Sequence, residues 1–71
     1  MRPRKYDIGN YRIEQAENGH VTAREIDSDG SSGFLKAHMQ YNKRINRRDA
    51  KRIVHTIEWL TNMEALEELI R

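Results

Sequence analysis

Residues 11–27 have the sequence YRIEQAENGHVTAREID, in which the Asn18-Gly19 pair separates two segments of alternating apolar and polar residues. Asn-Gly is the strongest short-range signal for a β-hairpin, because a two-residue type I′ turn needs positive φ at both central positions. This turn fixes the register and places Arg12 opposite Glu25. The strands predicted on this basis span about residues 11–16 and 21–27.

A third strand is predicted after the turn-rich residues 28–33, SDGSSG, because alternation resumes at Phe34. In the resulting register, Arg12, Glu25 and Lys36 form a ladder of alternating charge on one sheet face. The opposite face is mostly apolar and suits packing against a helix. The third strand spans about residues 34–41.

A helix is predicted from residue 47, since Asn46 is a good N-cap and Asp49 stands at the third helical position. An apolar stripe at helical spacing follows and should cover the apolar sheet face. The stripe comprises Ala50, Ile53, Val54, Ile57 and Leu60. The predicted fold is therefore α+β, with a three-stranded antiparallel β-meander followed by a long kinked or broken C-terminal helix on one sheet face.

The break is predicted near Thr61, because Thr61-Asn62-Met63-Glu64 matches a capping box. The two helical segments would then span about residues 47–60 and 62–71. The alternative is one long helix with a second apolar face for a dimer partner or another protein. That face would consist of Trp59, Met63, Leu66 and Ile70.

The chain has 71 residues, which is one domain near the lower size limit for a self-sustaining core. A domain this small often needs idealised packing or a partner, so a homodimer is a real option. The expected division is a basic N-terminal arm at residues 1–10 and a single small α+β domain at residues 11–71.

The composition argues against several classes of protein. The chain has no cysteine, and its three histidines lack metal-ligand spacing. It also has no Gly-rich phosphate loop and no nucleophile motif. We therefore expect a non-catalytic protein without metal, cofactor or small-molecule substrate. No apolar run could span a membrane and no signal peptide follows the basic start, so we expect a cytoplasmic protein without membrane contact.

Six basic residues occupy the ten positions 43–52, where Asp49 is the only acid. They form three pairs at four-residue intervals, which returns them to nearly one face of a helix. Cations near a helix N-terminus are disfavoured by the macrodipole, so an anionic partner is the simplest reason for this arrangement. We call this set the basic ridge, and it comprises Lys43, Arg44, Arg47, Arg48, Lys51 and Arg52.

Part of the ridge continues along the helix as an outward stripe formed by Arg48, Arg52, His55 and Trp59. Guanidinium groups beside an aromatic ring suit phosphate contact combined with base stacking. The alternative is that Trp59 is a core residue, packed under the N-terminal arm or the second helical segment, while the arginines are only solvated. Three basic residues near the N-terminus would form an accessory arm: Arg2, Arg4 and Lys5.

The sequence favours a small non-catalytic protein that binds an acidic partner, with nucleic acid as the leading candidate, through the basic ridge. The sheet face away from the helix carries both signs of charge, which argues against nucleic-acid readout there. The alternative function is a protein–protein inhibitor of the phage or mobile-element type. Such an anti-CRISPR, other anti-defence or host-takeover protein would occlude a larger host protein, with the Trp59 face as its target or dimer interface.

Overall fold

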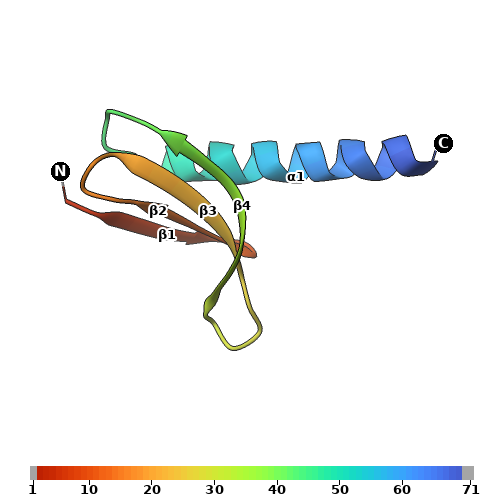
Figure 1. Ribbon diagram of the computed structural model, residues 1–71, viewed down its shortest axis with the longest axis horizontal. Coiled ribbons are helices and arrows are strands. Elements are labelled where there is room, and N and C mark those ends of the chain that lie inside the picture. Colours follow the sequence, from red (N-terminus) through yellow and green to blue (C-terminus); the bar gives the residue numbers. More distant parts are fainter. Residues whose placement is uncertain (1, 70–71) are drawn as a thin grey trace.

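The computed structural model describes the backbone of residues 2–69 and the side chains of residues 2–60. Within that range, four strands form one antiparallel sheet in the order β1-β2-β3-β4, and one helix packs against a single face (Figure 1). The elements are β1 (Arg4–Ile8), β2 (Tyr11–Gln15), β3 (His20–Ile26), β4 (Ser32–Gln40) and α1 (Arg47–Leu69). The α+β class is as predicted, but the sheet has four strands where the sequence indicated three.

The additional strand, β1, lies where a basic arm without regular structure was expected. It pairs with β2 so that Tyr6 lies opposite the buried Ile13 and therefore faces the helix, whereas Lys5 faces the other way. Gly9 has φ of 57° at the first position of the two-residue β1–β2 loop, where type II′ hairpins carry glycine. Arg4 and Lys5 therefore lie on a strand of the sheet, whereas Arg2 precedes it.

The β2–β3 loop contains three residues, 17–19, where the Asn18-Gly19 pair predicted a two-residue turn. The Gly19 amide donates to the Ala16 carbonyl and the Ala16 amide donates to the His20 carbonyl, both at 2.9 Å. Gly19 has φ of 89°, whereas Asn18 does not have positive φ. A type I′ turn needs positive φ at both positions, so this loop belongs to the three-residue class with one left-handed residue at its end.

The longer loop shifts the β2–β3 register by one residue and changes which side chains face the helix. Val21 and Ala23 are buried in the core, whereas Thr22 lies on the opposite face. The predicted charge ladder across three strands is also wrong, because Arg12 lies opposite Arg24. A one-residue slip exchanges the two faces of a strand, and here burial of Val21 and Ala23 decides the register.

Gly19 cannot be replaced without strain, because its backbone is left-handed and its α-carbon lies against the chain after β4. A Cβ at this position would lie 2.5 Å from the Tyr41 carbonyl oxygen. Gly30 has a similar φ of 85° but faces open space. We expect Gly19→Ala to lower the free energy of unfolding by about 2 kcal/mol or more, and Gly30→Ala by about 1 kcal/mol. Urea denaturation of the two variants checks this, and equal losses would contradict the role of the Tyr41 contact.

The start of α1 is confirmed as a reciprocal capping box. The Asp49 amide donates to the Asn46 side-chain oxygen at 2.8 Å, and the Asn46 amide donates to the Asp49 carboxylate at 3.0 Å. Two backbone donors at the helix N-terminus are thereby satisfied. The cap fixes where the helix begins and hence which residues of the basic ridge are helical.

The core lies between the sheet and the first three turns of α1. Its buried apolar residues are Ile13, Val21, Ala23, Ile45, Ala50, Val54 and Ile57. Leu60, predicted to extend this stripe, is 49% exposed because the helix has passed the end of the sheet at that point (Figure 1).

One polar side chain, Gln15, is 1% exposed in this core. Its amide group donates to the carbonyls of Gly19, Tyr41 and Lys43, and its oxygen accepts from the Ile45 amide at 2.9 Å. Gln15 therefore supplies the hydrogen bonds that the β4–α1 connection cannot obtain from secondary structure. It holds the start of the basic ridge against the sheet.

Helix α1 is continuous from Arg47 to Leu69, so the predicted break near Thr61 is wrong. The last glycine of the chain is Gly33 and its single proline is Pro3, which leaves no helix-breaking residue in this region. Beyond Ile57, the last buried position among the described side chains, the helix continues for about 18 Å at 1.5 Å per residue. The helix thus extends well past the sheet (Figure 1).

Candidate functional site

The basic ridge occupies the loop after β4 and the first turns of α1. All six of its side chains are exposed. Lys43 and Arg44 precede the helix, and the other four residues lie within it. The apolar side chains between them, including Ala50 and Val54, are buried against the sheet. The alternation of buried apolar and exposed basic positions therefore directs the ridge to solvent.

Among the side chains that the structure describes, the charge of the ridge is not compensated by paired acids. No ridge residue forms an ion pair with an acid among the side chains of residues 2–60. Asp49, the acid within the ridge, accepts the capping hydrogen bond at the helix start. Elsewhere, Arg12 pairs with Asp7 at 2.9 Å and Lys36 pairs with Glu25 at 3.2 Å. The ridge is thus a positively charged surface. It differs in this from Arg12 and Lys36, whose charges are offset by acids.

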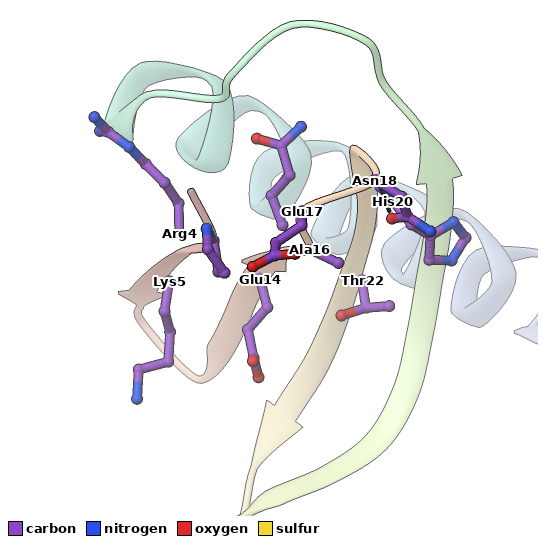
Figure 2. Close-up of a pocket in the computed structure, with 10 residues that line it drawn as sticks. Arg4, Lys5, Glu14, Ala16, Glu17, Asn18, His20 and Thr22 are labelled. Carbon is purple, nitrogen blue, oxygen red and sulfur yellow. Dashed lines mark hydrogen bonds between the residues drawn. The ribbon is translucent and has the colours of Figure 1, made fainter. Parts of the chain in front are cut away.

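The ridge extends onto β1 through Tyr6. The Arg47 guanidinium lies over the Tyr6 ring, 5.7 Å from its centroid, and Arg4 donates a hydrogen bond to the Tyr6 hydroxyl at 2.5 Å. Arg4 therefore lies next to the ridge, whereas Lys5 points to the opposite side of β1 (Figure 2). Arg2 is exposed beyond the strand. Of the three predicted arm residues, only Arg4 contacts Tyr6, the residue that Arg47 of the ridge covers.

Tyr6 was not predicted as part of the site. The alternation of Arg4, Tyr6 and Ile8 with Lys5 and Asp7 was the signal that could have identified β1. A strand here places alternate residues on the helix side, which is how a residue near the N-terminus meets Arg47.

The outward stripe of α1 is exposed along its described length. Arg48, Arg52 and His55 are exposed, and Trp59 is 55% exposed and lies outside the core cluster. The interpretation of Trp59 as a core residue is therefore wrong. The indole thus lies exposed on the same helix as the exposed guanidinium groups of Arg48 and Arg52.

The predicted dimer or partner face can be described only at its beginning. Trp59 is accompanied by Leu60, which is 49% exposed, where α1 leaves the sheet. The side chains of Met63 and Leu66, and Ile70 as a whole, lie outside the described residues.

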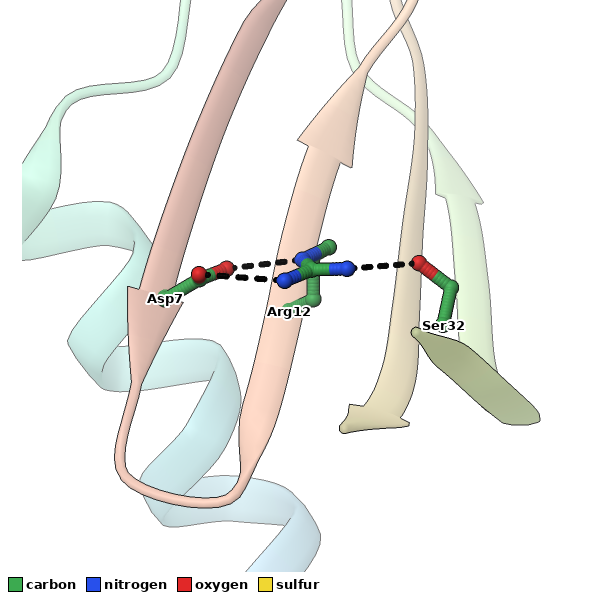
Figure 3. A network of polar contacts seen from close by, with 3 residues as sticks. All are labelled: Asp7, Arg12 and Ser32. Atoms are coloured by element: carbon green, nitrogen blue, oxygen red, sulfur yellow. Dashed lines mark hydrogen bonds and ion pairs between the residues drawn. The ribbon is translucent and has the colours of Figure 1, made fainter. Parts of the chain in front are cut away.

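The sheet face away from α1 does not form a second basic surface. Arg12 donates two hydrogen bonds to Asp7 and a third to the Ser32 hydroxyl (Figure 3). The hydrogen bonds from Arg12 hold the pKa of the Asp7 carboxyl below its ordinary value, and Asp7 raises the pKa of Arg12 in turn. This ion pair offsets the Arg12 charge with that of Asp7.

A shallow hollow of about 760 Å³ lies near the β2–β3 hairpin, and residues of both charge signs line it (Figure 2). Beside it, the His20 and His38 rings approach to 5.4 Å between centroids, although the sequence spacing did not indicate that they converge. Within the described part of the chain, no three His, Cys, Asp or Glu side chains gather as a metal-binding group.

No family model, curated protein or solved structure matches this chain. Among the described residues, no helix has the length and apolar character required to cross a membrane.

Proposed function

We propose that this protein is a small non-catalytic binding protein that contacts nucleic acid through the basic ridge. The observation that carries the proposal is the exposure of six basic side chains without an acidic partner among the described residues. Holding like charges together at a helix N-terminus costs free energy in the isolated protein. A polyanion that spans several of them offsets that cost by neutralisation and counterion release.

Each part of the surface has a distinct role in this proposal. Arg47, Arg48, Lys51 and Arg52 contact phosphates, and Lys43 and Arg44 flank them. Arg4 supports the same surface, since it contacts the Tyr6 hydroxyl beneath the Arg47 guanidinium. Trp59 stacks on a base or anchors the strand, about 10 Å further along the helix than Arg52 at 1.5 Å per residue.

The salt dependence of binding tests the proposal. With about four phosphate contacts on duplex DNA, the slope of log K against log salt should be about −3.6, a loss of roughly 100-fold between about 50 and 200 mM KCl. Fluorescence anisotropy with a labelled duplex and the matching single strand measures this slope for each. Absence of binding at the lowest salt, or an affinity that salt does not change, would overturn the proposal.

The second candidate is a protein–protein inhibitor of the phage or mobile-element type that occludes a host protein. The observation that favours it is the exposure of Trp59 and Leu60, at 55% and 49%, where α1 leaves the sheet. Apolar anchors of this kind carry binding energy at protein interfaces. If the partner is a host protein, Trp59→Ala abolishes association at any salt concentration. If the partner is nucleic acid, the same change removes one stacking contact and leaves the slope of log K against log salt unchanged.

A further inference from the structure

The two edge strands of the sheet differ in how they are protected against further pairing. β1 follows Pro3 and carries three charged residues among its five. β4 has nine residues and one charged side chain, Lys36, which is paired with Glu25. Proline and charge are two of the devices that keep an edge strand from pairing with another chain, and β-bulges, which β4 has near Leu35, are a third. β1 has both proline and charge, and β4 has little of either.

β4 also exposes apolar side chains. Among the described side chains, three of the five exposed large hydrophobic residues lie on it: Phe34 at 80%, Leu35 at 43% and Met39 at 46% exposure. In the sheet, β4 pairs with β3 alone, so its outer backbone groups face away from the protein. A long, apolar edge strand with one unpaired side is a template for strand addition.

The helix face of β4 borders an apolar groove. The backbone of α1 approaches β1 more closely than it approaches β4, which lies at the other edge of the sheet. A hollow of about 200 Å³ remains between β4 and α1, lined by Met39, Tyr41 and Ile53 among others, with a smaller one of about 40 Å³ beside Ala37. A strand added to β4 would extend the sheet and place side chains over this groove.

We propose that the strand added to β4 is β4 of a second copy, paired antiparallel about a two-fold axis at His38. The part of β4 from Ala37 to Gln40 pairs regularly with β3, whereas bulges follow towards Leu35. A pair centred on His38 uses this regular part and places Ala37 opposite Met39 of the second copy on the groove side. Lys36 then lies opposite Gln40, so no like charges meet. A pair centred on Lys36 would instead oppose two lysines.

This arrangement makes one eight-stranded sheet with both α1 helices on the same face, because the axis is perpendicular to the sheet. The two basic ridges then face the same side. A joint role of the two ridges in binding nucleic acid rests on the proposed function. The dimer itself does not rest on it, and dimer formation is measured without nucleic acid.

A single-cysteine crosslinking experiment tests the register, since the chain has no cysteine of its own. His38→Cys should crosslink efficiently with a short bismaleimide, because the two thiols meet at the axis. Lys5→Cys is the matched control. Lys5 is aligned with His38 across the sheet, because Lys5 pairs with Glu14, Glu14 with Thr22 and Thr22 with His38, but it lies on β1. Its thiols would be about 34 Å apart, at seven strand spacings of about 4.8 Å. Equal crosslinking of the two variants would overturn the proposal.

Sedimentation equilibrium of the unmodified protein should give twice the chain mass of 8.4 kDa at micromolar concentrations. Met39→Lys should weaken the dimer at least about tenfold, because it places a cation over the apolar groove between the two copies. Phe34→Lys makes the same change outside the regular segment and should leave the dimer intact. A monomeric wild-type protein, or a dimer that Trp59→Ala but not Met39→Lys dissociates, would overturn the proposal. If Met39→Lys does not fold, the His38→Cys result decides.

Discussion

Gln15→Met should lower the free energy of unfolding by about 3 kcal/mol, a large fraction of the total for a chain of this size. Methionine has nearly the same shape as glutamine but cannot form hydrogen bonds with the backbone. The substitution leaves the Ile45 amide without its partner and removes the donor shared by three carbonyls. Because Gln15 is 1% exposed, water cannot replace these bonds without opening the core.

Gln40→Met is the matched control for this change. Gln40 is exposed and donates one hydrogen bond, to the Asn18 carbonyl. Its substitution should cost less than about 0.5 kcal/mol. Urea denaturation measures both variants, and the exchange rate of the Ile45 amide reports the β4–α1 connection directly. A Gln15 variant as stable as the Gln40 variant would show that the connection does not depend on this side chain.

The sequence predicted the start of α1 correctly because the signal is local. Asn46 and Asp49 are three residues apart, and each satisfies the other's backbone amide. The exposed position of the basic ridge followed from the same helix start and the apolar spacing after it. The end of the core at Ile57 could not be predicted in this way, because it depends on the length of the sheet beneath the helix.

The β2–β3 register was wrong because Asn18-Gly19 fits both a two-residue and a three-residue loop. The choice involves distant residues: the Tyr41 amide donates to the Gly19 carbonyl at 3.2 Å. Gln15, which bridges the same region, was overlooked because glutamine is usually exposed. The contact between Tyr6 and Arg47 needs β1, a short charged strand whose pairing the sequence did not reveal. The sequence therefore located the candidate ridge, but not its extension onto the sheet.

Arg48→Glu combined with Arg52→Glu should reduce affinity for duplex DNA by about 100-fold or more at low salt. Two phosphate contacts are lost, so the slope of log K against log salt should become shallower by about 1.8. The fold should not suffer, because both side chains are exposed. Position 48 also lies in the first turn of α1, where an acid is favoured by the helix dipole. Anisotropy titrations at several salt concentrations, with thermal unfolding of the same samples, separate lost binding from lost structure.

The control must distinguish the ridge from the overall charge of the protein. The double change takes the net charge from +2 to −2, since each reversal subtracts two. Lys5→Glu with Lys36→Glu makes the same change on exposed strand positions outside the ridge. It should weaken binding only slightly, because these side chains lie outside the proposed contact surface and distant charges are screened within about 10 Å. If both double variants lose the same affinity and slope, binding depends on net charge and the assignment of the ridge is wrong.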